Sequence, residues 1–149
     1  MVTVKQLLAK KGNDYYFVKP TTLTYEALQK MSEKDVGALM VIDKDKLVGI
    51  FSERDYARKV ILQGKSSKES QVSEFMSNKI YFVSPAETIF DCMALMTNHH
   101  IRHLPVLDHN EIVGIVSIGD VVNAVIYAQK STIKDLENYI LGGGYGANS

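Results

Sequence analysis

The chain has 149 residues, 46% of them hydrophobic and 23% charged, and its 17 basic and 17 acidic side chains cancel. This length fits one compact domain or two small halves with a shared core, and the missing basic excess argues against nucleic acid or an acidic membrane surface as the main partner. Because there is no run of about 20 apolar residues, no signal-peptide pattern and only one cysteine, Cys92, we expect a soluble cytoplasmic protein without an internal disulfide.

Apolar patterns and turn residues predict the elements of the first half of the chain. The continuous apolar run Ala38–Ile42 is typical of a short buried strand. Ser52 is a good helix N-cap and Gly64 a good C-cap, so we expect a helix between them, to about Gln63. In chain order, the expected elements are helix Val4–Lys10, strand Tyr15–Val18, helix Tyr25–Glu33, strand Ala38–Ile42, strand Leu47–Phe51 and the helix that follows Ser52.

After a polar, serine-rich linker, the same order of patterns returns. The expected elements are a brief helix Val72–Met76, strand Ile80–Val83, helix Glu87–His99, strand Leu104–Leu107, strand Ile112–Val116 and helix Asp120–Gln129. Ser131 or Thr132 is expected to cap a separate last helix that ends at Leu141, and the following residues read as a flexible tail. The chain is thus divided into an N-terminal segment with the first unit (1–64), a linker (65–79), a second unit (80–129) and a C-terminal helix with its tail (130–149).

The two halves are copies of one another. When residues 16–61 are compared with residues 81–126, at a fixed offset of 65, 15 of the 46 positions are identical and no gap is needed. Average residue usage would give roughly three identities. Each half reads as β-α-β-β-α, and one half alone buries little apolar surface. We therefore predict an α+β fold in which two pseudo-symmetric units pack sheet to sheet.

The best-preserved stretch of the repeat joins a strand to a helix, as Gly49 to Asp55 in the first copy and Gly114 to Asp120 in the second. Such a junction offers free backbone N–H groups and the positive end of a helix dipole. The glycines would let a ligand approach the backbone closely. The serines of the two copies, Ser52 and Ser117, can donate to a phosphate, and the aspartates can accept from two ribose hydroxyls.

Other side chains near these turns complete a nucleotide signature. Basic side chains that could bind phosphate are Arg54, Arg58, Arg102 and His103. Apolar side chains that could enclose a flat base are Val36, Ile50, Ile101 and Ile115. A plainer interpretation stays open, because serine followed by an acid is also what any helix N-terminus favours.

A metal site and a catalytic site are the two other classes of site that the sequence could contain. His99 and His103 have the i, i+4 spacing of metal ligands, but Pro105 indicates that the helix ends earlier and no cysteine or carboxylate lies nearby in sequence. We therefore expect no metal site. We expect His103 to face a groove between the two repeated turns. The sequence contains no catalytic triad, paired carboxylates, Walker loop or Gly-x-Gly-x-x-Gly in a recognisable context. We expect no enzyme.

Motifs in both halves resemble a tandem pair of CBS domains, a Bateman module. They are Val48-Gly-Ile-Phe-Ser-Glu-Arg-Asp55 and Val113-Gly-Ile-Val-Ser-Ile-Gly-Asp120, preceded by Val18-Lys-Pro and Val83-Ser-Pro, with Ile101-Arg-His-Leu-Pro-Val-Leu-Asp108 on the second strand of the second half and Glu74-Phe-Met-Ser77 between the halves. The resemblance covers about residues 4–126 and is closest to stand-alone CBS-pair proteins. It implies a regulatory module that binds adenosine nucleotides, with AMP first and ATP, ADP, NADH or S-adenosylmethionine as alternatives. It also implies a disc-like homodimer.

The resemblance also implies two sites. One would use Gly114, Val116, Ser117 and Asp120, with Arg102 and His103 toward phosphate and Val36, Gly37 and Ala38 from the other half. The other would use Phe51, Ser52, Arg54 and Asp55, with Ile101 and Arg102 opposite and Met76, Ser77 and Asn78 nearby. Because Gly37-Ala38 stands where the second half has Arg102-His103, the sites should differ, and we expect the Asp120 site to be richer in phosphate-binding groups. The effector would be a separate, unknown protein. The alternative function is a ligand-independent dimeric scaffold.

Overall fold

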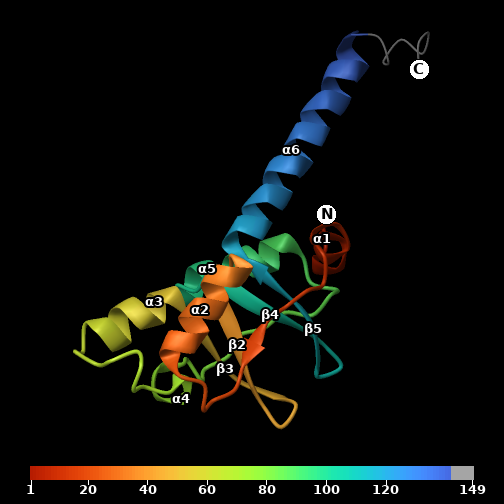
Figure 1. Ribbon diagram of the computed structural model, residues 1–149. Coiled ribbons are helices and arrows are strands. Elements are labelled where there is room, and N and C mark those ends of the chain that lie inside the picture. The colour runs from red at the N-terminus through yellow and green to blue at the C-terminus, as the bar shows by residue number, and fades with distance from the viewer. Residues whose placement is uncertain (142–149) are drawn as a thin grey trace.

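The computed structural model describes residues 1–141, so the expected flexible tail at 142–149 lies outside the described residues. The chain forms α1 (Val4–Lys11), β1 (Phe17–Val18), α2 (Thr24–Lys34), β2 (Ala38–Asp43), β3 (Lys46–Ser52), α3 (Glu53–Asp55), the π-helix η1 (Tyr56–Ile61), α4 (Val72–Phe75), α5 (Ile89–His99), β4 (His103–Asp108), β5 (Glu111–Ser117) and α6 (Ile118–Leu141) (Figure 1).

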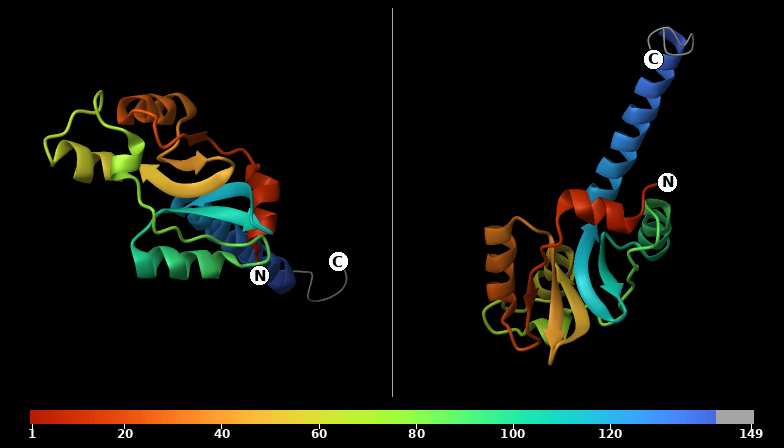
Figure 2. Two further views of the ribbon diagram at one scale, coloured as in Figure 1. Left: turned by 90° about the horizontal axis from the view of Figure 1, so that it is seen from below. Right: turned by 90° about the vertical axis from the view of Figure 1, so that its right-hand side faces the viewer.

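The sheets confirm the pseudo-symmetric α+β fold. The first sheet has the order β1-β2-β3 and the second consists of β4-β5. Both hairpins have the same register, with a bulge between Val41 and Ile42 in one and between Val106 and Leu107 in the other. The two sheets face one another in the middle of the molecule, with α2 outside the first and α5 outside the second (Figure 2). The apolar faces of both hairpins are therefore buried between helix and sheet.

The short helices that precede each unit are exchanged between the units. Helix α1 packs in the core of the second unit, where Val4, Leu7 and Leu8 are buried beside α5, β4 and β5. The Val4 N–H donates to the Glu87 carbonyl at 2.7 Å. Helix α4 packs in the first core through Val72. The N-terminal segment that precedes the first unit in the sequence thus packs in the core of the second unit.

The two motif glycines make room for these exchanged helices. A Cβ atom added to Gly114 would lie 3.0 Å from Leu8 of α1, and one added to Gly49 would lie 2.5 Å from the Met76 Sδ just after α4. The contact at Gly49 would require Met76 to move, and the contact at Gly114 would require Leu8 to shift by a few tenths of an ångström. Each glycine therefore leaves space for a side chain that packs from an exchanged helix or directly after it.

Several elements differ from the sequence-based expectations. The expected strand Ile80–Val83 is reduced to a single parallel bridge between Val83 and Val106, and β1 omits Tyr15 and Tyr16. The helix after Ser52 continues as the π-helix η1. The expected break near Ser131 is wrong, since α6 runs without interruption from Ile118 to Leu141. Ser and Thr are tolerated inside a helix when they bond to the preceding turn, and Thr132 Oγ1 donates to the Ala128 carbonyl at 3.0 Å.

Helix α6 extends well beyond the body of the molecule (Figures 1 and 2). Only Val121 of this helix is buried, whereas Ile133, Leu136 and Ile140 are more than half exposed. Within residues 1–141, no helix combines the length and apolar character that a membrane crossing requires.

Candidate functional site

The two repeated turns open into two cavities that involve both units. The Asp55 cavity has a volume of about 500 Å³, and the Asp120 cavity has about 370 Å³. Both volumes lie within the range of small-molecule sites, about 300–1,000 Å³. The Asp55 cavity is lined by Gly37, Ile50, Ser52, Glu53, Arg54, Asp55, Arg58, Lys59, Ser77, Lys79, Tyr81, His100, Ile101, Arg102 and His103. The Asp120 cavity is lined by Lys11, Gly12, Asp14, Tyr15, Tyr16, Asp35, Val36, Gly37, Ala38, His103, Ile115, Ser117 and Asp120.

The strand-to-helix turn holds the Asp55 carboxylate at the edge of its cavity. Asp55 Oδ2 accepts from the Ser52 N–H at 3.0 Å and from Ser52 Oγ at 3.1 Å, while the Asp55 N–H donates back to Ser52 Oγ. This is a capping box, which satisfies free donors at the start of a helix. Lys59 Nζ lies 3.2 Å from Asp55 Oδ1. One carboxylate oxygen therefore anchors the turn, and the other faces the Lys59 ammonium group, which also donates to the Phe75 carbonyl at 3.3 Å.

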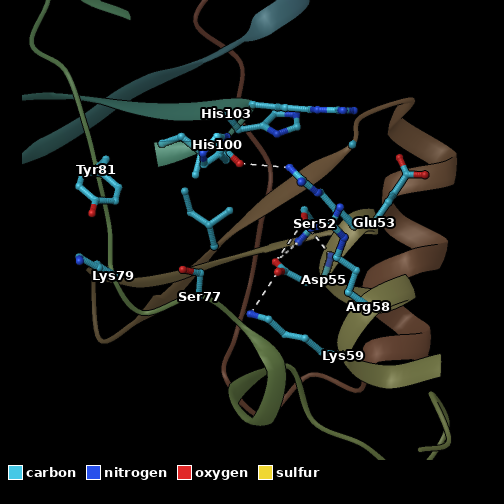
Figure 3. Close-up of a pocket in the computed structure, with 15 residues that line it drawn as sticks. Ser52, Glu53, Asp55, Arg58, Lys59, Ser77, Lys79, Tyr81, His100 and His103 are labelled. Carbon is cyan, nitrogen blue, oxygen red and sulfur yellow. Dashed lines mark hydrogen bonds and ion pairs between the residues drawn. The ribbon is translucent and has the colours of Figure 1, made fainter. Parts of the chain in front are cut away.

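The rest of the Asp55 cavity combines cations with flat and apolar walls. Its basic side chains are Arg54, Arg58, Lys59, Lys79 and Arg102, together with His100 and His103. The guanidinium of Arg54 is tied to the other half of the chain, since its Nη1 donates to the His100 carbonyl at 3.1 Å. Tyr81 and Lys79 lie across the cavity from Asp55 and Lys59 (Figure 3). The cavity thus offers acceptors for hydroxyls, donors for an anion and a ring beside them.

The Asp120 cavity repeats the turn but fills it differently. Asp120 Oδ2 accepts from the Ser117 N–H at 2.8 Å and from Lys11 Nζ at 2.6 Å. Partial burial alone would raise the pKa of Asp120, but the hydrogen bonds from Lys11 and Ser117 outweigh it and hold the pKa below its ordinary value. The carboxylate is therefore ionised at neutral pH and already paired with a cation.

His103 lies between the two cavities and lines both. A Cβ atom added to Gly37, on the facing half, would lie 3.4 Å from the His103 ring. Burial lowers the pKa of His103 below 6.5, and the positive charges of Lys11 and Arg102 lower it further against the opposing effect of Asp120. The ring is therefore neutral at pH 7 and can donate or accept one hydrogen bond.

The depressed pKa of His103 predicts a pH dependence of stability. As the pH falls through 6.5, the unfolded chain takes up a proton at this position before the folded chain does. The free energy of unfolding should then fall by up to about 1.4 kcal/mol per pH unit, until the pH reaches the folded pKa. Urea denaturation between pH 8 and 5 should show this decrease in the wild type and lose it in His103→Gln.

The matched control is His109→Gln, since His109 lies on the exposed hairpin turn between β4 and β5 and its side chain is 95% exposed. This variant should keep the wild-type decrease. If His103→Gln retains the decrease while His109→Gln loses it, the assignment to His103 is wrong.

The structure brings most of the predicted site residues to one of the two cavities. Those at the Asp55 cavity are Ser52, Arg54, Asp55, Arg58, Ser77, Ile101 and Arg102. Those at the Asp120 cavity are Val36, Ala38, Ser117 and Asp120. Gly37 and His103 line both. Six line neither cavity, namely Gly49, Phe51, Met76, Asn78, Gly114 and Val116.

Phe51 and Val116 lie elsewhere because they point into the cores of the two units, where both are 0% exposed. In a strand, side chains alternate between faces, so the neighbours Ile50 and Ile115 face the cavities instead. Asn78 is exposed to solvent.

The charges are distributed in the opposite way to our expectation. Arg102 lines the Asp55 cavity and not the Asp120 cavity. The basic side chains at the Asp120 cavity are Lys11 and His103, and they stand beside Asp14, Asp35 and Asp120. The Asp55 cavity is thus the one richer in phosphate-binding groups.

Several lining residues were missed from the sequence. Tyr16 and Tyr81 had a usable signal, because they are identical partners in the repeat and line equivalent cavities. Lys59 also had a usable sequence signal, because it stands one helical turn after Asp55. Lys11 had none, since it lies more than 100 residues from Asp120 in the chain.

The histidines do not form a metal site in the part of the chain that the structure describes. The His99 ring stacks on Tyr81 at 3.7 Å between centroids, while His103 faces the cavities. Residues 1–141 contain no group of three His, Cys, Asp or Glu side chains placed to bind a metal. Burial raises the pKa of the Cys92 thiol to about 11, so this cysteine is unreactive at neutral pH.

Comparisons with known proteins agree with the repeat and the fold. The family model described as CBS domain matches residues 4–61 and 72–127. The mitochondrial CBS domain-containing protein CBSX3 of Arabidopsis thaliana is 37% identical over 150 residues, covering 95% of this chain and 73% of its own. YhcV of Bacillus subtilis, also a CBS domain-containing protein, is 37% identical over 103 residues, which is 69% of this chain and 73% of YhcV.

Among solved structures, a protein from Burkholderia ambifaria that is assigned to signal transduction and contains CBS domains has a TM-score of 0.83 and 47% identity. The match covers 86% of this chain and 96% of that one. The family model matches both halves of the chain, and the fold is similar to that of a solved protein with CBS domains. The chain belongs to the CBS domain family and carries two CBS domains in tandem.

Proposed function

We propose that this protein is a regulatory sensor that binds an adenosine nucleotide in the Asp55 cavity and acts through a separate partner protein. The observation that carries the proposal is the composition of that cavity. Asp55 Oδ1 faces the cavity and pairs with Lys59 Nζ at 3.2 Å, and Arg54, Arg58 and Arg102 line the same space. A carboxylate suits the ribose hydroxyls and arginines suit a phosphate.

The walls of the cavity suit the base of a nucleotide. Tyr81, Ile50 and Ile101 are half-buried and line the same cavity. Flat and aliphatic side chains pack well on both faces of a base. AMP is the first candidate because it combines one ribose, one base and one phosphate, and the cavity of about 500 Å³ lies toward the smaller end of ligand sites.

The experiment is a calorimetric titration of the protein, first stripped of any ligand that co-purifies, with AMP, ADP, ATP, NADH and S-adenosylmethionine. We expect saturable binding of AMP. The matched control ligand is GMP, which keeps the ribose and phosphate and changes only the base, and it should bind more weakly. Failure of all five adenosine compounds to bind the folded protein would refute the sensor.

We further propose that the sensor is a homodimer and that it resides in the cytoplasm. The exposed apolar side chains on neighbouring helices support dimerisation, since Phe90 and Met93 on α5 and Val122 and Ile126 on α6 are all more than a third exposed. Exposed apolar patches mark interaction sites. The single buried cysteine supports a reducing compartment. The Arabidopsis relative, in contrast, is named as mitochondrial.

The alternative function is a ligand-independent scaffold. The feature that favours it is the outer part of α6, where Ile133, Leu136 and Ile140 are 55–67% exposed although the ordinary rule is to bury such residues. The titration separates the two functions, because a scaffold predicts no saturable nucleotide binding.

A further inference from the structure

We propose that Lys11 occupies the ribose position of the Asp120 cavity, so that this cavity stays closed to a nucleotide until the lysine is displaced. The inference rests on the proposed function, in which Asp55 holds ribose hydroxyls, and it gives the equivalent Asp120 of the second turn the same role. It makes the two cavities unequal. The Asp55 cavity is then the site that fills first, and Lys11 determines whether the second one fills.

The geometry of Lys11 is that of a bound ligand rather than of a solvated side chain. Its Nζ donates to Asp120 Oδ2 at 2.6 Å and to the Ile115 carbonyl at 2.6 Å. The side chain is only 30% exposed. Two short bonds to a carboxylate and a carbonyl satisfy the acceptors that a ribose diol would need. A ribose cannot bind the same carboxylate edge without removing this ammonium group.

Helix α1 holds Lys11 in this position. The helix begins with a capping box between Thr3 and Gln6, and its first turn is bonded to the second unit through the Glu87 and Pro85 carbonyls at 2.7 and 2.9 Å. Leu8 fits against Gly114 in the middle of the helix. Lys11 is the last helical residue, and Gly12 turns the chain away with a φ of 107°. The lysine is thus presented from a rigid support.

The other half of the molecule provides an internal comparison. Helix α4 is the counterpart of α1, because Met76 packs on Gly49 as Leu8 packs on Gly114. Three residues after these packing residues stand Lys11 and Lys79, and Lys79 also lines its cavity. Among the described residues, however, Asp55 pairs with Lys59 of its own helix and not with Lys79.

The pairing of Asp55 with Lys59 is also weaker in geometry. Its N–O distance is 3.2 Å against 2.6 Å for Lys11 and Asp120, and the Lys59 side chain is 40% exposed. Lys59 reaches the carboxylate along the helix, whereas Lys11 reaches it from another element more than 100 residues away. The position of Lys59 in the first half is taken by Ala124 in the second. The two turns are therefore alike in backbone and different in what occupies them.

This arrangement has a consequence for the ligand that could open the Asp120 cavity. A neutral nucleoside offers the Lys11 ammonium group only hydroxyl acceptors, which are weaker partners than the Asp120 carboxylate. A phosphate group can accept from the same ammonium group. Only an anionic ligand, present at a concentration high enough to fill the weaker site, should displace Lys11.

The test is calorimetric titration with AMP of the wild type and of Lys11→Met, which keeps the length and helix preference of the side chain and removes its charge. We expect one equivalent of AMP to bind to the wild type in the range that saturates the Asp55 cavity, and two equivalents to bind to Lys11→Met. The matched control is Lys5→Met, because Lys5 is an exposed residue of the same helix. It should bind one equivalent, like the wild type.

Two results would overturn the inference while the proposed function stands, namely two equivalents in the wild type or one equivalent in folded Lys11→Met. No binding by any of the three proteins would instead refute the proposed function and the inference together.

An independent measurement checks the premise without a ligand. The pKa of the Asp120 carboxyl group should rise in Lys11→Met. Carbon NMR measures this pKa, and the Asp120→Asn variant assigns the signal. An unchanged pKa would show that Lys11 does not hold this carboxylate.

Discussion

Asp55→Asn should weaken AMP binding by on the order of 100-fold, because each charge-assisted hydrogen bond contributes about 1.5–3 kcal/mol and 1.4 kcal/mol corresponds to a factor of ten. The carboxylate can accept from both ribose hydroxyls at once, whereas the amide offers one acceptor oxygen and an NH2 group that only donates. Asp55 also caps its helix through Ser52, so the loss of affinity must be separated from a loss of the cap. Isothermal titration at several protein concentrations measures the affinity, and urea denaturation measures the stability.

The matched control is Asp91→Asn. Asp91 forms the same capping box with Thr88 at the start of α5, and it lines neither cavity. Both variants should lose a similar amount of stability, up to about 2 kcal/mol, while only Asp55→Asn should lose affinity. Equal affinities of the two variants for AMP would remove Asp55 from the binding site.

The local features of this fold could be predicted because they are encoded in short stretches. The serine and aspartate of each turn form the expected cap, with Ser52 and Asp55 in one copy and Ser117 and Asp120 in the other. The hairpin turns were also predictable, since Asp43 and Asp108 begin identical tight turns in which the next two residues have φ values of 50° and 66°. The repeat then extended each local inference to the other half.

Features that depend on contacts distant in sequence could not be predicted in this way. Nothing near Gly114 indicates that Leu8 will pack on it from a helix that belongs to the opposite core. The same holds for the ion pair between Lys11 and Asp120. A glycine after a strand reads as an opening for a ligand when only its neighbours are known, and as a packing site once the exchanged helices are in place.

The side of the strand on which a motif residue falls is a second feature that the resemblance does not provide. The family resemblance placed Phe51 and Val116 in the two sites, but the strand alternates and the cores need one apolar side chain at these positions. Both are fully buried, and Ile50 and Ile115 take the places beside the cavities. The motif marks the two turns that line the cavities, and the period of the strand determines which of its side chains face them.

This assignment predicts that Phe51→Ala acts on folding and not on a binding contact. Phe51 is the largest fully buried side chain and packs with Leu39, Val41 and Val60 in the first core. Its truncation should lower the free energy of unfolding by about 3–5 kcal/mol, the usual cost of removing a buried aromatic ring and leaving a cavity. Urea denaturation at pH 7.5, followed by circular dichroism, measures this loss.

Two further variants separate the core role from a ligand role. Phe82→Ala removes the same ring from a position that is 51% exposed, and it should change the stability by no more than about 0.5 kcal/mol. Phe51→Leu keeps an apolar side chain in the core, so it should stay folded and bind AMP with the wild-type affinity. A folded Phe51→Leu protein that loses AMP binding would contradict this assignment.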